Sequence, residues 1–217
     1  MKNLLIKEFK LTACPLTFVF ICFTIMTMIP KYPILVGAFF ICLGILYTFQ
    51  FAREDNDIVY TALLPVAKKD VVKAKFTFVL IIELISFTLT ASITLIRMIF
   101  LSKSTAYIDN PLMNANLIYL GYYLIIFSLF NLVFFIKFFK TAYYFGKPFL
   151  YFSITAFLFI CAVEILHNLP GLDILNITSF DHLWLQLSIF LFSSIIFILV
   201  SFYSLKKSIY YFERIDL

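Results

Sequence analysis

The charged side chains of this sequence gather in one segment, Arg53–Lys75. Nine of the 29 charged residues fall within these 23 positions. Five are basic and four are acidic: Arg53, Lys68, Lys69, Lys73 and Lys75, with Glu54, Asp55, Asp57 and Asp70. Because the segment lies between two long apolar runs, it favours a surface that a soluble partner binds. The alternative is a solvated loop with no role beyond its charge.

Few other residues carry chemistry inside the apolar runs. Glu83 and Glu164 each lie within one, where an ionised carboxylate facing lipid is costly. We therefore expect each carboxyl to face protein or water, or to be neutral, and both are candidates for a polar or substrate path. Arg97 is expected to anchor the outer end of its run.

The sequence predicts no catalytic centre and no metal site. His167, Asp173, Asp181 and His182 share one segment, but their spacing matches no standard metal site. The four cysteines all lie in apolar runs and are typical of small packing residues. An intramembrane enzyme is disfavoured, because no paired nucleophile and base is evident.

Composition requires lipid as the solvent for most of the chain. The sequence is 63% hydrophobic and 13% charged, against about 25% charged in soluble domains. Six apolar runs are each long enough to cross a membrane as a helix. They predict an all-α integral membrane protein with one domain over residues 1–217 and spans at Leu11–Pro30, Pro33–Ala52, Phe76–Phe100, Leu117–Phe139, Pro148–His167 and Leu183–Leu205.

The distribution of basic residues predicts the orientation. Fourteen of the 17 Lys and Arg residues fall on one side of these spans, with both termini and the Arg53–Lys75 segment. The positive-inside rule places that side in the cytoplasm, and the chain in the plasma membrane. The Met1–Lys10 segment predicts a helix lying in the lipid headgroup layer, with a frayed tail as the alternative.

Prolines, glycines and a capping residue predict the turns and short helices between the spans. Pro30–Pro33 predicts a tight turn between the first two spans, and Gly37 and Gly44 allow close helix approach. Asp57 is expected to cap a short helix over Ile58–Leu64. Pro65 should end it, and a second helix should begin near Lys68 and continue into the third span.

The segment EDNDIVYTALLPVAKKDVVKAKF resembles the connection between the second and third spans of type-2 ATP-binding-cassette (ABC) exporter permeases, in their small six-span bacterial branch. The L-P-V triplet, the basic residues after it, the V-V pair and K-A-K-F carry the similarity. The short N-terminal helix, the first hairpin and the tail KKSIYYFERIDL extend it. Ala67 departs from the pattern, because a helix-capping Ser is common there, and this puts the start of the second helix in doubt.

This resemblance implies half of a membrane channel, paired with a second permease and with two soluble ATPase subunits. The short helix would be the coupling helix that docks to an ATPase, through Asp55, Asp57, Ile58, Tyr60, Thr61, Leu64, Pro65, Lys68 and Lys69. The ATPase subunits would bind ATP and Mg²⁺, since this sequence contains no G-x-x-x-x-G-K-[ST] loop. No cofactor of its own and no nucleic acid partner are expected.

The resemblance further implies export by alternating access, and the scarcity of charge in the spans favours an apolar or amphipathic cargo. An alternative is the vitamin-capturing membrane subunit of an energy-coupling-factor importer, which matches in size and number of spans. Substitutions at Tyr60, Leu64 and Pro65 should separate the two interpretations, because only a coupling helix would lose an ATPase.

Overall fold

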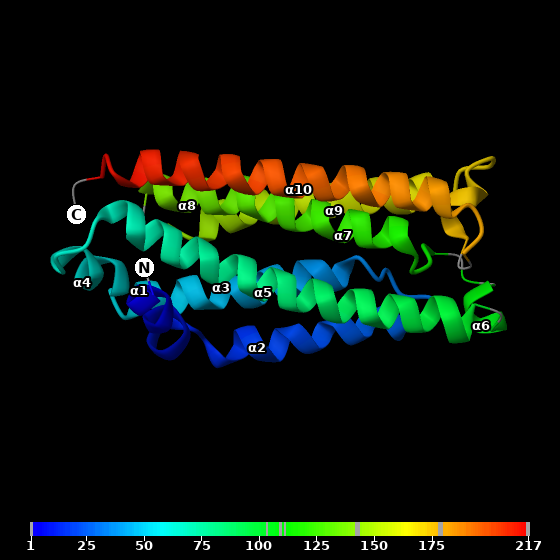
Figure 1. Ribbon diagram of the computed structural model, residues 1–217, viewed down its shortest axis with the longest axis horizontal. Coiled ribbons are helices and arrows are strands. Elements are labelled where there is room, and N and C mark those ends of the chain that lie inside the picture. Colours follow the sequence, from blue (N-terminus) through cyan, green and yellow to red (C-terminus); the bar gives the residue numbers. More distant parts are fainter. Residues whose placement is uncertain are drawn as a thin grey trace.

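The protein is a bundle of helices that run along one long axis (Figure 1). In the computed structural model, the described residues are 2–102, 104–108, 110, 112–141, 144–177 and 180–215, and none of them forms a strand. Five described helices are long and apolar enough to cross a membrane, and a sixth crossing is reached when a bent helix pair counts as one span. The fold is therefore that of an all-α integral membrane protein.

The long elements follow the chain with short helices between them. They are α2 (Pro15–Ile21) with the 3₁₀ segment η2 (Cys22–Met28), α3 (Val36–Glu54), α5 (Lys68–Ile96) with the π-helical η3 (Arg97–Leu101), α7 (Leu117–Leu129) with the π-helical η4 (Phe130–Phe135) and α8 (Ile136–Thr141), α9 (Gly146–His167) and α10 (Leu183–Phe212). The short ones are α1 (Lys2–Lys7), the π-helical η1 (Glu8–Thr12), α4 (Asp57–Leu63), α6 (Thr105–Ile108) and η5 (Asp173–Asn176).

The first span differs from the prediction. Instead of one straight helix over Leu11–Pro30, the chain bends by 88° between Lys2–Thr12 and Pro15–Met28. Pro15 explains the bend, because a residue before proline is pushed out of the α region, and Cys14 is extended with ψ 133°. Leu11 and Thr12 thus belong to the N-terminal helix, which lies across the span as an interfacial helix would.

Small residues bring α2 and α3 into close contact. The Thr17 hydroxyl donates to the carbonyl oxygen of Gly44 at 2.6 Å and lies 2.8 Å from the Thr48 hydroxyl. A Cβ on Gly44 would lie 2.6 Å from the Cβ of Phe20, and one on Gly37 would lie 3.2 Å from the Phe23 carbonyl oxygen. The predicted role of both glycines in close helix approach is confirmed.

Replacing Gly44 by alanine should therefore lower the thermal stability of the protein in detergent. Overpacking of this kind costs about 1–3 kcal/mol, which exceeds the ~1 kcal/mol that alanine gains over glycine in a helix. Gly146→Ala is the matched control, because a Cβ there meets nothing within 4 Å. Unfolding followed by scanning fluorimetry should show a lower Tm for Gly44→Ala alone; an equal rise for both variants would contradict the packing argument.

The core is aromatic and lies around α3, α7 and α8. Phe49 contacts Phe134, Phe135 and Phe138 edge-on, with ring centroids 4.8–5.9 Å apart. Most of α3 and α7 is buried, whereas α9 and α10 are largely exposed. These two helices thus present apolar faces to lipid or to a partner.

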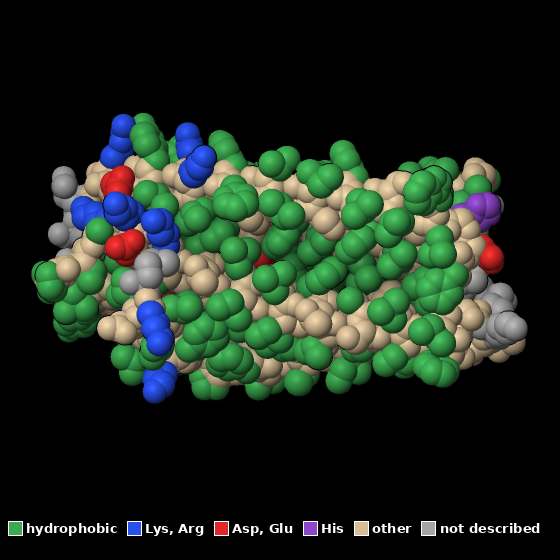
Figure 2. All heavy atoms as spheres, viewed as in Figure 1, with side chains coloured by type: hydrophobic (Ala, Val, Ile, Leu, Met, Phe, Trp, Pro, Cys, Tyr) green, Lys and Arg blue, Asp and Glu red, His purple; other side chains and the backbone are tan. Residues whose placement is uncertain are grey.

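Two helices reach beyond the predicted spans at the same end of the molecule. α5 begins at Lys68, as predicted and despite Ala67, and α10 continues to Phe212 instead of ending at Leu205. The eight residues of α5 before Phe76 add roughly 12 Å of helix. Both termini and α4 lie at this end (Figure 1), and Lys and Arg side chains gather there, while the middle of the visible surface is hydrophobic (Figure 2).

Candidate functional site

The connection between α3 and α5 folds into α4, a short helix at the lysine-rich end. α4 spans Asp57–Leu63 and ends where Leu64, ahead of Pro65, turns extended with ψ 154°. The predicted cap is wrong: Asn56, with a left-handed φ of 51°, occupies the N-cap, and Asp57 lies in the first turn. The carboxylate of Asp57 is engaged elsewhere.

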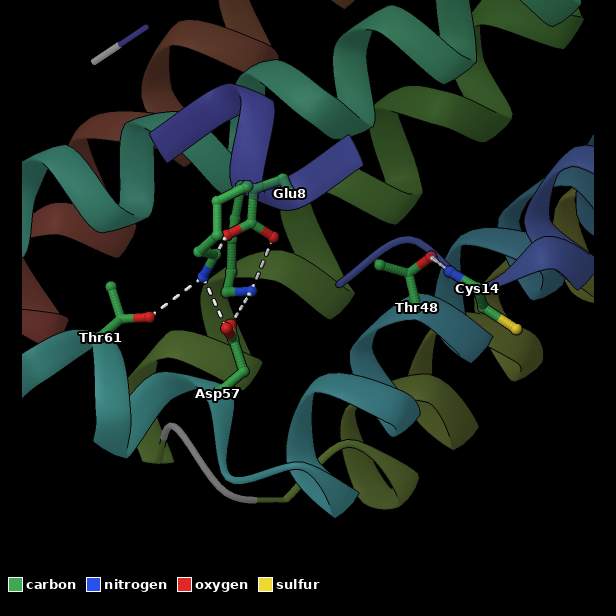
Figure 3. A network of polar contacts seen from close by, with 7 residues as sticks. Glu8, Cys14, Thr48, Asp57 and Thr61 are labelled. Carbon is green, nitrogen blue, oxygen red and sulfur yellow. Dashed lines mark hydrogen bonds and ion pairs between the residues drawn. The ribbon is translucent and has the colours of Figure 1, made fainter. Parts of the chain in front are cut away.

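Asp57 belongs to a closed ring of four alternating charges. The Lys7 Nζ lies 2.6 Å from Asp57 Oδ1 and 3.0 Å from Glu8 Oε1, while the Lys75 Nζ lies 2.9 Å from both Glu8 Oε2 and Asp57 Oδ2. Figure 3 shows these side chains converging from three elements. We call Lys7, Glu8, Asp57 and Lys75 the charge quartet. It joins the N-terminal helix, α4 and α5.

The charge quartet is shielded from water. The side chains of Glu8 and Lys75 are 2% and 3% exposed, and those of Lys7 and Asp57 are 16% and 15% exposed. Burial alone would raise the pKa of Asp57, but the charge of Lys75 and hydrogen bonds from Lys7 and Lys75 outweigh it, so this pKa lies below its ordinary value. Asp57 is therefore ionised at neutral pH.

Neighbouring contacts hold the N-terminal helix and α4 in place. Lys7 also donates to the Thr61 hydroxyl at 3.0 Å, and the ring of Phe9 meets that of Phe78 on α5 edge-on at 4.9 Å. Beyond the bend, the Cys14 backbone N–H donates to the Thr48 hydroxyl on α3 at 3.2 Å (Figure 3). The charge quartet thus ties the N-terminal helix to α4 and α5, and a separate hydrogen bond ties the start of α2 to α3.

The outward side of α4 is apolar and exposed. Tyr60 is 67% exposed, Leu63 79% and Leu64 52%. Pro65 is exposed beside them, together with the charged Asp55 and Lys69. Large apolar side chains at the charged end of the molecule indicate a contact surface.

The predicted docking residues divide into two groups. The exposed group comprises Asp55, Tyr60, Leu64, Pro65 and Lys69. Ile58 and Thr61 are buried on the inner face of α4. Asp57 belongs to the charge quartet, and Lys68 donates to the carbonyl oxygen of Ile215 at 2.6 Å, which fixes the tail against α5. Ile58, Thr61 and Asp57 thus support α4 from its inner side, and Lys68 serves the tail.

A groove of about 600 Å³ opens between the N-terminal helix and the end of α4. Lys2, Lys7, Leu64, Pro65 and Asp70 are among its lining residues. The apolar end of α4 therefore borders a hollow that is large enough to receive side chains of a partner.

Glu83 is buried within the bundle, as predicted for a carboxyl that faces protein. It is 0% exposed, and its Oε2 accepts a hydrogen bond from Asn131 Nδ2 at 3.0 Å. The backbone carbonyl oxygen of Asn131 accepts a hydrogen bond from the Ser204 hydroxyl of α10. Glu83 thus joins α5 to the centre of the bundle.

Arg97 holds the end of its apolar run in place through contacts inside the protein and not at the membrane surface. Its side chain is buried and donates to the Thr27 carbonyl oxygen and, at 3.3 Å, to Asn114 Oδ1. The guanidinium also lies 4.2 Å from the ring centroid of Tyr107. Arg97 therefore holds the first hairpin and the loop before α7 together.

Glu164 and His167 fasten the same end of the bundle. Glu164 Oε2 accepts from the Met113 backbone N–H at 3.0 Å, and His167 Nδ1 lies 3.4 Å from Asn176 Oδ1. Glu83 and Glu164 thus bind different partners, and no contact of the described residues links them into one path. Among the described residues, no group of three or more His, Cys, Asp or Glu is placed to hold a metal ion. The side chain of Asp173 is not among those described.

Comparison with known families decides what kind of protein carries this site. The family described as ABC-2 family transporter protein matches residues 3–213. The chain belongs to this family. It is thus an ABC-2 permease, the membrane subunit of an ABC transporter, and works with ABC ATPase subunits. No curated protein and no solved structure gives a significant match.

Membership of the family favours the permease interpretation over the vitamin-capturing subunit. In this ABC-2 permease, sequence reasoning located α4 to within one residue but missed Leu63, its most exposed side chain, and the charge quartet. Leu63 was detectable, because it lies three residues after Tyr60 on a helix surface. The quartet was not, since Glu8 and Lys75 are 67 positions apart and only the fold brings them together.

Proposed function

We propose that this ABC-2 permease forms half of an exporter and that α4 is the coupling helix through which an ATPase moves it. The observation that carries the proposal is an exposed apolar face, formed by Tyr60, Leu63 and Leu64, on a helix that is fixed from behind by the charge quartet. A soluble partner that docks there buries apolar area and pushes on a rigid element. By the positive-inside rule, the lysine-rich end with both termini faces the cytoplasm.

The contact surface proposed for the ATPase is smaller than the sequence suggests. Tyr60, Leu63, Leu64 and Pro65 form its apolar centre, and Asp55 and Lys69 form a charged rim. Ile58, Thr61 and Asp57 position the helix from its inner side, whereas Lys68 holds the C-terminal tail against α5. An apolar centre with a polar rim is the usual composition of a protein interface.

Motion of α4 reaches the spans through two routes. The first is covalent, because α4 connects to α3 and α5 through only a few residues at each side. The second is the charge quartet, which ties α4 to the N-terminal helix and thus to the bend ahead of α2. Closure of two ATPase subunits around ATP and Mg²⁺ would move these three spans together and open the permease pair outward.

The remaining features suit a pair of permeases that move an apolar or amphipathic cargo. α9 and α10 expose apolar faces that a second permease or lipid can cover. The buried ionisable side chains of Glu83 and Arg97 are both engaged inside the bundle, which leaves little charge to replace water around a polar solute.

Transport by the reconstituted complex tests this function. Proteoliposomes that contain the permease, its partner permease and the ATPase should move a fluorescent amphipathic compound only when ATP and Mg²⁺ are supplied on the side of α4. The same vesicles should not pass small ions. Transport without ATP, or robust ion flux, would contradict the proposal.

A further inference from the structure

A basic hollow lies away from α4, where α8 ends and α9 begins. It has a volume of about 450 Å³, and its lining includes Lys137, Lys140, Lys147, Tyr144 and Tyr151. None of the described residues that line it is acidic. The hollow therefore presents three ammonium groups with no carboxylate among them.

The lysines come from the two helix ends that face each other. Lys137 and Lys140 lie in α8, and Lys147 lies in the first turn of α9. The Lys137 Nζ lies 3.5 Å from the ring centroid of Tyr151, which directs this ammonium into the hollow. All three lysines are exposed, so their charges are free to meet a ligand.

A second hollow, lined mainly by apolar side chains, follows along the same helix. It has a volume of about 480 Å³ and is lined by Leu150, Ser153, Ile154, Phe157, Leu158 and Cys161 of α9. Lys147, Tyr151, Ile154 and Leu158 lie three or four residues apart, on one face of the helix. From Lys147 to Leu158 the helix rises roughly 16 Å, which is about half of a ~30 Å hydrocarbon core.

We propose that these two hollows form one site for an anionic phospholipid. The three lysines bind the headgroup phosphate, and an acyl chain lies along the apolar groove through one leaflet. Basic hollows between membrane helices at the cytoplasmic surface bind anionic lipid headgroups in this way.

The charges favour lipid over a second copy of the chain. In a two-fold symmetric contact centred on this hollow, the lysines of one copy would face those of the other. A phosphate with attached acyl chains complements both the basic and the apolar part.

Competition between lipids, followed by native mass spectrometry of the delipidated full chain, tests the site. The probes are phosphatidylglycerol and phosphatidylcholine with identical acyl chains, so that only the headgroup charge differs. Wild-type protein should retain phosphatidylglycerol in preference. Lys140→Gln with Lys147→Gln should reduce this preference by about tenfold or more, since each lysine close to the bound headgroup contributes roughly fivefold and this contribution falls off with distance.

Two control proteins and one competitor complete the test. Lys10→Gln with Lys206→Gln removes the same charge from exposed positions at the same end of the molecule and should leave the preference within about twofold. Lys140→Arg with Lys147→Arg keeps the charge and should keep the preference. Glycerol 3-phosphate at millimolar concentration should not displace the lipid, because it lacks acyl chains.

Each contrary result overturns the proposal in a recognisable way. An equal loss in the Lys10 and Lys206 variant would assign the preference to general surface charge. Displacement by glycerol 3-phosphate would assign the hollow to a free phosphate. Loss of a dimer instead of lipid in the Lys140 and Lys147 variant would assign it to a contact between permeases.

Discussion

Replacing Lys75 by methionine is expected to lower the free energy of unfolding by about 3–5 kcal/mol, because it leaves a buried carboxylate without a compensating charge. In the charge quartet, Lys7 and Lys75 each pair with both Glu8 and Asp57. Without Lys75, the two carboxylates share the single positive charge of Lys7. The loss is measurable as a lower midpoint of chemical unfolding in detergent, followed by circular dichroism. ATP-driven transport should fall with it, since α4 loses its ion pair with α5.

A second substitution separates the charge effect from lost packing. Glu8→Gln combined with Lys75→Met leaves the ion pair of Lys7 and Asp57, which has no net charge. The double variant should therefore be more stable than Lys75→Met alone. Lys73→Met, two residues away on α5, is the control and should change stability by less than about 0.5 kcal/mol. Equal losses for Lys73→Met and Lys75→Met would show that the quartet does not support the fold.

Replacing Leu63 by aspartate should abolish association with the ATPase without affecting membrane insertion. Leu63 is the most exposed side chain of the apolar face of α4, and a charge there would be buried unpaired in the interface. Central interface residues cost about 2 kcal/mol or more on truncation, which corresponds to at least roughly thirtyfold in affinity. Co-purification of the ATPase with the tagged permease measures the loss.

The conservative variant is the control for this result. Leu63→Met keeps an apolar side chain of similar size and should retain the ATPase. Tyr60→Ala, Leu64→Ala and Pro65→Ala should each weaken association by a smaller amount, since each removes part of the same surface. If Leu63→Asp retained as much ATPase as Leu63→Met, the docking surface would lie elsewhere.

The helices of this permease could be predicted where apolar runs and prolines act locally. Pro65 and Lys68 fix the end of α4 and the start of α5, and both were located from the sequence. The bend at Cys14 was not, although Pro15 follows it, because the apolar run continues through the bend and masks it. Span length and hydropathy therefore identify a membrane crossing but not the point at which its helix bends.

The candidate site was predictable only in part, because its contacts join distant segments. The outward residues of α4 follow from helix spacing. The charge quartet depends on the N-terminal helix folding back against α5, which no local pattern encodes. Arg97 is an intermediate case: Glu83, Ser86, Thr90, Thr94 and Arg97 recur every three or four residues on one buried face of α5, a pattern that indicates an inward-facing arginine.

Site-directed photo-cross-linking in intact membranes tests the central claim most directly. A photoreactive amino acid at position 63 of α4 should cross-link to the ABC ATPase. The same group at Trp184, which is 83% exposed in the first turn of α10 and thus at the end of that helix away from Phe212, should not. A cross-link to the ATPase from position 184, or none from position 63 in an active transporter, would contradict the account of α4 as the helix on which the ATPase acts.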